Sequence, residues 1–197
     1  MTNIHSDFVT PKTKPILPGF YIVVSGGPGS GKTLLARPVA EALRLPLLSK
    51  DTIKEALFDE LGIGDRLWSR RLGRASVAVL YRIAANTPAA VLESVFHHDL
   101  AVADLQALEK PLIELHCQCD KEVALQRFEE RATDERHPGH LDSQQPRNRL
   151  VELVEEGLEP LRLGGPLLEV NTNNRVDVAQ VVDWIKAQPE YQKTLDL

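Results

Sequence analysis

Short apolar runs alternate with longer segments of helical periodicity along most of the chain. Five runs rich in aliphatic and β-branched residues predict strands, at residues 20–25, 46–49, 89–94, 111–118 and 167–171. The first run, FYIVVS, is almost continuously apolar, so we expect a strand that is buried on both faces. Runs of this kind are typical of a parallel sheet.

The segments between these runs predict helices. Helical periodicity occurs at 31–45, 52–61, 65–86, 122–131, 146–159 and 176–187. Gly73 could interrupt the third helix, and the polar segment 133–146 predicts a loop. Strands and helices that alternate in this way, with right-handed crossovers, favour an α/β fold in which helices cover both faces of the sheet.

The chain is long enough for a single domain, which we place at residues 19–197 behind a flexible tail at 1–18. Hydrophobic residues make up 43% and charged residues 26%, as in an ordinary globular protein. No apolar run approaches the length of a membrane span, and the first residues lack a signal-peptide pattern, so we expect a cytoplasmic protein. The net charge of −5 gives no reason to expect indiscriminate nucleic-acid binding, although a local basic patch is compatible with it.

One motif indicates specific chemistry. Residues 26–33 read GGPGSGKT and match the phosphate-binding pattern G-x-x-x-x-G-K-[ST] in full, between a buried strand and a helix. Backbone N–H groups of such a loop surround phosphate oxygens, and the N-terminus of the following helix favours the same anion. We therefore expect ATP to bind here, with the Lys32 ammonium on the β- and γ-phosphates and the Thr33 hydroxyl on Mg²⁺. The predicted nucleotide-binding residues of the loop are Gly27, Gly29, Ser30, Gly31, Lys32 and Thr33.

Asp51 and Lys54 follow the second predicted strand. Ligands of parallel sheets lie beyond the carboxyl ends of the strands, so we expect Asp51 close to the γ-phosphate. A carboxylate there can accept the proton of an attacking hydroxyl, and Lys54 can hold the acceptor or the transferring phosphoryl group. The alternative is structural, with Asp51 as a helix N-cap and Thr52 with Glu55 as a capping box.

Glu93 ends the third predicted strand, where P-loop proteins usually present an acidic residue toward the magnesium shell. Its carboxylate could hold a metal-bound water or a group of the acceptor. The alternative is a charged strand end that faces solvent.

Arg127 and Arg131 are four residues apart, so they share one face of a predicted helix that leads into the polar segment. We predict a lid at about 127–146. Arginines of a lid can close over ATP and neutralise charge on the γ-phosphate, and closure excludes water. The alternative is a solvated helix whose arginines pair with Glu130 and Glu135.

The third predicted helix contains five arginines and, after its first residue, no acidic residue. Arg66, Arg70 and Arg74 form a row on one face of this helix. Such a row suggests an anionic substrate, either a phosphorylated molecule or a nucleic-acid end, and Trp68 and Tyr81 could add stacking surface. A solvated face or a subunit interface is the alternative.

Together, these motifs resemble those of small AAA-type P-loop ATP-binding proteins, which are related to the kinase domain of polynucleotide kinase, to chloramphenicol phosphotransferase and to zeta toxins. The resemblance covers about residues 20–188. It rests on residues 26–33, Ser49-Lys50-Asp51 with Lys54, Leu92-Glu93-Ser94 and Arg136-His137-Pro138-Gly139-His140. It implies a P-loop, nucleoside-kinase-like, three-layer α/β/α fold with five parallel strands in the order 2-3-1-4-5.

The resemblance also implies roles for single residues. Asp51 corresponds to a general base, and Lys54 corresponds to a basic residue that positions the reacting groups. Polynucleotide kinases usually have arginine at the second position, so a lysine, which lacks the bidentate fork, weakens the case for a nucleic-acid acceptor. The lid arginine corresponds to Arg127 or Arg131, and Asn173 lies where such folds contact adenine.

The leading functional hypothesis is a kinase that uses ATP and Mg²⁺ to phosphorylate a hydroxyl of a small molecule, which the arginine row suggests is anionic. Arg70, Arg74 and Glu93 then belong to the acceptor site. One alternative is a polynucleotide 5′-hydroxyl kinase, and another is a non-catalytic, ATP-binding regulator or toxin-like protein. The sequence leaves the identity of the acceptor, the choice between ATP and GTP, and the oligomeric state open.

Overall fold

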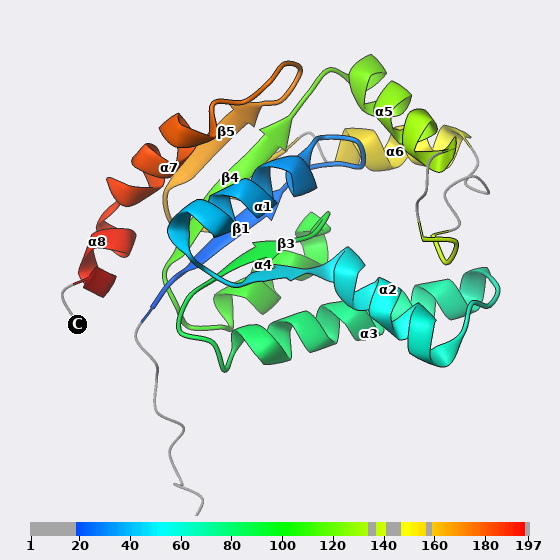
Figure 1. The fold of residues 1–197 in the computed structure, drawn as a ribbon, viewed down its shortest axis with the longest axis horizontal. Coiled ribbons are helices and arrows are strands. Elements are labelled where there is room, and N and C mark those ends of the chain that lie inside the picture. Colours follow the sequence, from blue (N-terminus) through cyan, green and yellow to red (C-terminus); the bar gives the residue numbers. More distant parts are fainter. Residues whose placement is uncertain (1–18, 134–136, 141–146, 157–158, 196–197) are drawn as a thin grey trace, which may run out of the picture.

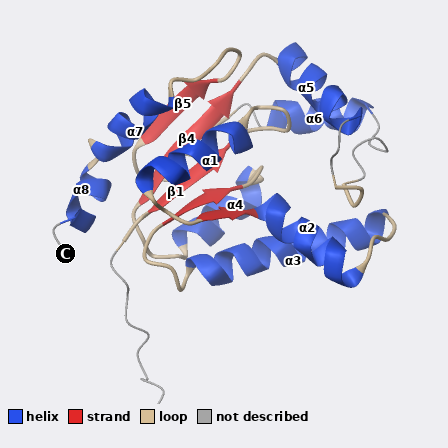
Figure 2. Ribbon diagram, in the orientation of Figure 1, coloured by secondary structure: helices blue, strands red, loops and turns tan. Residues whose placement is uncertain are grey.

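The sheet has the predicted topology. The computed structural model describes residues 19–133, 137–140, 147–156 and 159–195, so the predicted tail and part of the predicted lid lie outside the described residues. Five parallel strands pair in the order β2-β3-β1-β4-β5, and helices lie on both sides of this one layer (Figures 1 and 2). The strands are β1 (Tyr21–Ser25), β2 (Leu47–Ser49), β3 (Ala90–Glu93), β4 (Leu112–Gln118) and β5 (Leu167–Asn171). The predicted nucleoside-kinase-like α/β fold is therefore confirmed.

The helices differ from the prediction at three places. The helix predicted over 65–86 continues through Gly73 without the interruption that we considered. Two short helices, α4 with nine residues and α8 with seven, were not predicted, because the stability of a short helix depends more on tertiary packing than on its own sequence. The helices are α1 (Lys32–Leu43), α2 (Lys50–Leu61), α3 (Arg66–Ala84), α4 (His98–Gln106), α5 (Lys121–Thr133), α6 (Arg147–Glu156), α7 (Val178–Lys186) and α8 (Pro189–Leu195).

Alternate residues of the strands build two cores, one on each face of the sheet. In β1, Ile22 and Val24 pack with α1 and α7, whereas Tyr21 and Val23 pack with α3 and α4. All residues of β1 are buried, as the continuous apolar run predicts. A third, smaller core lies between α5 and α6, away from the sheet, and its largest member is Phe128.

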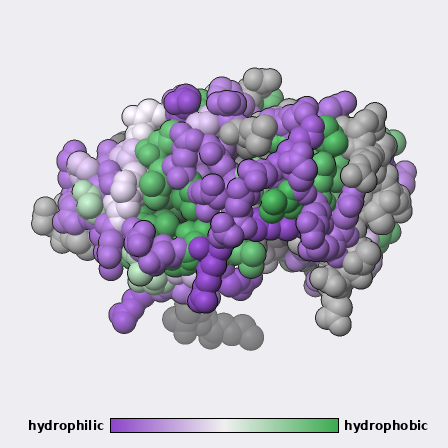
Figure 3. Space-filling view, turned by 90° about the horizontal axis from the view of Figure 1, so that it is seen from above, coloured by the Kyte–Doolittle hydropathy of each residue, from purple (hydrophilic) through white to green (hydrophobic). Residues whose placement is uncertain are grey.

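The surface carries mostly hydrophilic side chains in the view from above, with apolar residues in separate patches (Figure 3). Among the described residues, no helix combines the length and the apolar character that crossing a membrane requires.

A buried carboxylate anchors the segment that leads into β5. Glu114 of β4 is 1% exposed, and its two oxygens accept hydrogen bonds from the backbone N–H groups of Leu161 (2.7 Å) and Arg162 (2.9 Å). The hydroxyl of Ser25, directly before the glycine-rich loop, donates to the same carboxylate at 3.1 Å. Burying a charged group is energetically costly unless it has hydrogen-bond partners. These three bonds therefore allow Glu114 to lie in the core.

Replacing this carboxylate should destabilise the fold. The substitution Glu114→Ala leaves two backbone donors without an acceptor, and each such donor costs about 1–3 kcal/mol. We therefore expect the free energy of unfolding in urea to fall by about 2–6 kcal/mol. The control Glu169→Ala removes an exposed carboxylate of β5 and should change it by less than about 0.5 kcal/mol. Equal effects of the two substitutions would contradict the anchoring role.

Candidate functional site

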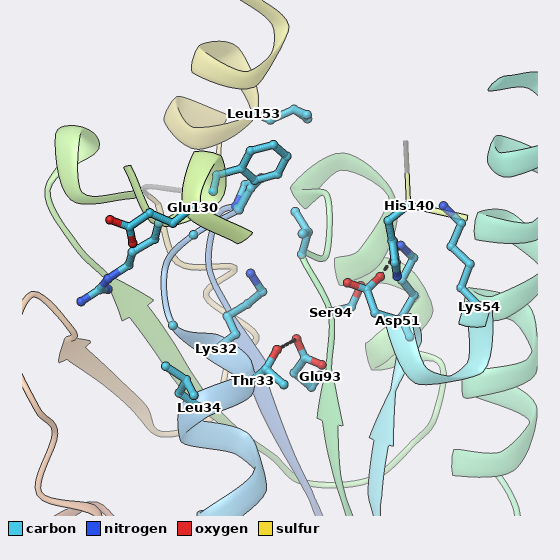
Figure 4. Close-up of a pocket in the computed structure, with 17 residues that line it drawn as sticks. Lys32, Thr33, Leu34, Asp51, Lys54, Glu93, Ser94, Glu130, His140 and Leu153 are labelled. Carbon is cyan, nitrogen blue, oxygen red and sulfur yellow. Dashed lines mark hydrogen bonds and ion pairs between the residues drawn. The ribbon is translucent and has the colours of Figure 1, made fainter. Parts of the chain in front are cut away.

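The carboxyl ends of β1, β2 and β3 meet at one edge of the sheet. Glu93 of β3 pairs in register with Val24 of β1 and with Ser49 of β2. A cavity of about 540 Å³ opens at this edge between the glycine-rich loop, α2 and α5. In Figure 4, Lys32, Thr33 and Glu93 lie on the loop side of this cavity, and Asp51 and Lys54 lie on the α2 side.

The glycine-rich loop has the geometry of a phosphate cradle. Gly29 has a φ of 79° and packs so closely that a Cβ there would lie 2.2 Å from the carbonyl oxygen of Ala124. The Lys32 ammonium donates to the carbonyl of Gly27 at 2.7 Å and is thereby held over the loop. The Ser30 hydroxyl is buried and has no hydrogen-bond partner among the described residues. A buried, unsatisfied hydroxyl beside a positioned ammonium fits the phosphate oxygens of a nucleotide.

Glu93 is buried at the first turn of α1, so the alternative of a strand end that faces solvent is wrong. It is 4% exposed, accepts a hydrogen bond from the Ser49 hydroxyl at 2.6 Å, and lies 3.4 Å from the Thr33 hydroxyl. The described residues contain no cluster of three or more His, Cys, Asp or Glu side chains that could hold a metal by themselves. One hydroxyl and one carboxylate fit Mg²⁺, because this ion keeps several waters and takes phosphate oxygens as further ligands.

Asp51 lies in the first turn of α2. This helix begins at Lys50 with Ser49 as its N-cap, so the alternative of Asp51 as an N-cap and of a capping box from Thr52 is wrong. The Lys50 ammonium contacts the Asp51 carboxylate at 2.7 Å, and the Asp51 side chain is 44% exposed. Asp51 thus presents a solvent-accessible carboxylate to the cavity, and Lys50 is a site residue that our sequence analysis did not assign.

Lys54, one turn later, is 9% exposed and points between α2 and α3. Its ammonium donates to the Ser69 hydroxyl at 2.9 Å and lies 5.2 Å from the centre of the Phe58 ring. Ser69 therefore binds the Lys54 ammonium. The sequence analysis assigned Lys54 to the site but not Ser69, because a serine within a helix belongs to no recognisable motif.

The described segment 137–140 packs onto the outer part of α2. His140 contacts the Glu55 carboxylate at 2.7 Å, His137 contacts that of Asp59 at 3.0 Å, and the His137 ring stacks on Phe58. His140 has a side chain that is 4% exposed and lines the cavity. The carboxylates at i and i+4 on α2 and the histidines three residues apart were visible in the sequence, but their pairing was not.

Arg127 does not extend toward Asp51. Its guanidinium donates to the backbone carbonyls of Thr172 (2.8 Å) and Asn173 (3.2 Å), beyond the end of β5. Arg127 and Asn173 line a further cavity of about 370 Å³ with Leu34, which is 82% exposed. Arg131 lies in the same helix, but its side chain falls outside the described part of the chain. An apolar side chain with amide and guanidinium groups beside it can accommodate a flat, polar base.

Arg66, Arg70 and Arg74 line one cavity, as their spacing predicts. This second cavity has a volume of about 530 Å³, and Tyr81 also lines it. Trp68 does not, because its indole N–H donates to the carbonyl of Gly62 at 2.9 Å on another side of α3. The first and second cavities share five lining residues, which are Lys50, Lys54, Ser94, Val95 and His140.

Comparison with known proteins bears on the family and the fold of this chain. A family model described as an AAA domain matches residues 22–152. The crystal structure of a Chloroflexus aurantiacus j-10-fl protein, provisionally named a kinase, has a TM-score of 0.77 and 39% sequence identity to this chain. That match covers 87% of this chain and 98% of the other.

Two more distant likenesses agree with the fold. Kti12 of Chaetomium thermophilum, solved in complex with ADP-AlF3, matches with a TM-score of 0.58 and 22% identity over 84% of this chain and 96% of that chain. Cytidylate kinase of Pyrobaculum neutrophilum is 50% identical over 42 residues, which are 21% of this chain and 23% of the relative. The match thus spans less than a quarter of the length of that enzyme.

The close packing of Gly29 yields a prediction for nucleotide binding. A methyl group in Gly29→Ala would displace either the loop or α5, so we expect at least a tenfold weaker affinity for ATP in a calorimetric titration.

Gly164→Ala is the matched control, because Gly164 has a similar φ of 89° but no atom of the described residues lies within 4 Å of an added Cβ. That substitution brings only backbone strain of about 1–2 kcal/mol and should leave ATP affinity unchanged. An unchanged affinity in Gly29→Ala would show that the loop does not need this close approach.

Proposed function

The chain belongs to the AAA domain family of P-loop proteins, and we propose that it is a kinase that transfers the γ-phosphoryl group of ATP to a hydroxyl of a small molecule. One observation carries this proposal. Asp51 faces the phosphate cradle across the first cavity, and the residues beside it also line a second cavity in which an acceptor can bind. A nucleotide-binding regulator would not require a carboxylate between two connected cavities.

The reaction we propose is a direct in-line transfer. The acceptor oxygen attacks the γ-phosphorus, and the Asp51 carboxylate takes the hydroxyl proton. A new bond forms between phosphorus and the acceptor oxygen while the bond to the β–γ bridging oxygen breaks, and ADP leaves. Lys32 stabilises the charge on the phosphates, and Lys54, held by Ser69, stabilises the transferring group from the acceptor side.

Backbone N–H groups of Gly27, Gly29 and Gly31 and the Ser30 hydroxyl are the proposed contacts to the phosphates. Mg²⁺, when bound, supplies positive charge at the β- and γ-oxygens. We assign the Thr33 hydroxyl as its protein ligand and Glu93 as the acceptor of a hydrogen bond from a coordinated water. The distances between Thr33, Glu93 and Ser49 support this assignment.

The two lid arginines receive different roles in this proposal. Arg127, with Asn173 and Leu34, binds the base of the nucleotide, since its guanidinium is already bonded beyond the end of β5. Its assignment as a catalytic residue would require release from those two carbonyls, so Arg131 is the better candidate for neutralising charge on the γ-phosphate. The lid at about 127–146, the single domain at 19–197 and a cytoplasmic location belong to the same proposal.

Arg70, Arg74 and the connected second cavity are the proposed acceptor site, and Glu93 would contribute to it from the first cavity. A small molecule is favoured over a 5′-hydroxyl polynucleotide end, because Lys54 offers one ammonium instead of a bidentate guanidinium and because the chain carries a net charge of −5.

Removing the base should abolish transfer while ATP still binds. We expect Asp51→Asn to lower kcat by roughly 10²–10⁴-fold, because proton abstraction by a positioned group contributes that much. The measurement is transfer of label from γ-labelled ATP, with Mg²⁺, to separate pools of nucleosides, sugars, antibiotics, nucleoside and sugar monophosphates, and 5′-hydroxyl oligonucleotides. Phosphorus NMR of the product then distinguishes a phosphate ester of a hydroxyl from a diphosphate.

Glu60→Gln is the matched control, because Glu60 is an exposed carboxylate of the same helix away from both cavities. It should retain full activity, and Lys32→Ala should lose both transfer and ATP affinity. If the wild-type protein binds ATP but labels no acceptor, or if Asp51→Asn keeps full activity, the proposed function is wrong. A diphosphate product would overturn the hydroxyl acceptor alone.

A further inference from the structure

The second cavity has one strongly cationic wall. Arg70 and Arg74 are exposed residues of α3, and neither has a carboxylate partner in the described part of the chain. Among the described lining residues, Asp104 of α4 is the acidic one. Guanidinium groups in this setting favour an anionic ligand, and phosphate matches their planar, bidentate geometry best.

Another part of the same cavity is apolar. Tyr81 and Val77 of α3, with Phe96 and Leu100 near α4, provide a surface for a carbon skeleton. Burial raises the pKa of Tyr81, and the negative charge of Asp104 adds to the rise. The Tyr81 hydroxyl therefore stays protonated and can donate a hydrogen bond. A ligand that uses the whole cavity has both an apolar part and an anionic group.

Gly73 leaves the space between Lys54 and the arginine row open. Among the described residues, a Cβ added at Gly73 would meet only Lys54, whose Cε lies 3.9 Å away. Glycine is unfavourable in the middle of a helix, and no close contact of the backbone requires it here. The absence of a side chain at this position therefore widens the cavity directly beside Lys54.

The positions of the lining residues along the cavity determine how such a ligand can lie. Lys50 and Lys54 at its inner end also line the phosphate site, and Lys50 contacts Asp51. Arg74 lies five residues beyond Ser69, which is about 7.5 Å along the helix axis at about 1.5 Å per residue. A hydroxyl at Asp51 and a second polar group several bonds away can thus be bound at the same time.

We propose that the acceptor is a small phosphorylated molecule, whose free hydroxyl lies at Asp51, whose carbon skeleton lies on the surface formed by Tyr81 and Leu100, and whose existing phosphate binds Arg70 and Arg74. This inference rests on the proposed kinase function and specifies its substrate class. The volume of about 530 Å³ suits a monomeric ligand better than a polymer.

The kinetic test compares acceptors that differ only in a phosphate group. Ribose is paired with ribose 5-phosphate, and uridine with uridine 3′-monophosphate, and a 5′-hydroxyl oligouridine is run beside them. We expect kcat/KM to be at least tenfold higher for the phosphorylated member of a pair. Preference for the oligonucleotide by tenfold or more would overturn the small-molecule assignment in favour of a nucleic-acid end.

Variants of α3 test the placement of the phosphate. We expect Arg74→Glu and Arg70→Glu to raise KM for the phosphorylated acceptor at least tenfold and to change KM for its neutral counterpart less than threefold. Arg71→Glu is the matched control on the other side of the same helix, where Arg71 lies 6.0 Å from the Trp68 ring, and it should behave as wild type. Gly73→Leu should raise KM for every acceptor, and leucine is a better helix former than glycine, so unfolding is not the expected cause.

A binding measurement separates this inference from the proposed function. Phenyl phosphate and phenol are titrated by ligand-observed NMR onto protein saturated with Mg²⁺ and a non-hydrolysable ATP analogue. Binding of phenyl phosphate but not phenol, lost in Arg74→Glu and retained in Arg71→Glu, supports the phosphate site even if no acceptor is labelled. Equal binding of both probes, or equal use of neutral and phosphorylated acceptors, overturns the inference while the kinase activity stands.

Discussion

The site depends on one buried carboxylate at the centre of the sheet edge. Glu93 ends the strand that lies between β1 and β2, so its side chain contacts both the first turn of α1, at Thr33, and the N-cap of α2, at Ser49. Because a buried carboxylate is stable only with such partners, its hydrogen bonds fix the starts of two helices relative to each other. The first of these helices carries the phosphate cradle, and the second carries Asp51. The separation between the phosphate cradle and Asp51 is therefore determined by how the sheet and these two helices pack.

Helix α2 connects the cavity beside the glycine-rich loop with the second cavity, our proposed acceptor site. Its first turn presents Asp51, its second turn presents Lys54 to Ser69 of the neighbouring α3, and its outer face holds the segment 137–140 through Glu55 and Phe58. The two helices lie side by side in Figure 1. Asp51 and Lys54 are thus on one helix, whereas most walls of the proposed acceptor cavity come from α3 and α4. Substitutions in those walls can alter specificity without displacing Asp51.

The parts of this structure that the sequence predicted are those that local chemistry determines. Continuous apolar runs placed the strands within about two residues, and glycine spacing identified the phosphate loop. Parallel topology then brought Asp51 and Glu93 to one edge without any knowledge of their contacts. The sequence did not predict the contacts between segments that are distant along the chain. The Lys54–Ser69 pair joins residues 15 apart, and the His140–Glu55 pair joins residues 85 apart. The spacing of Arg127 gave its helix face, but its bonds to backbone carbonyls depend on where β5 ends.

The charge distribution is the reason why we propose a small anion and not a polyanion as the acceptor. The chain as a whole carries a net charge of −5, so a long nucleic acid would meet repulsion over most of the surface. Arg70 and Arg74 instead line one cavity whose walls are partly apolar, where field lines concentrate. A monomeric anion enters that local field without approaching the acidic surface elsewhere. Negative charge on the acceptor would also attract it toward Lys54 and the arginine row, on the side of Asp51 that faces away from the nucleotide phosphates. In our proposal, Lys32 on one side, Arg70 and Arg74 on the other, and Lys50 and Lys54 between them would offset the charges of two anionic substrates in adjoining cavities.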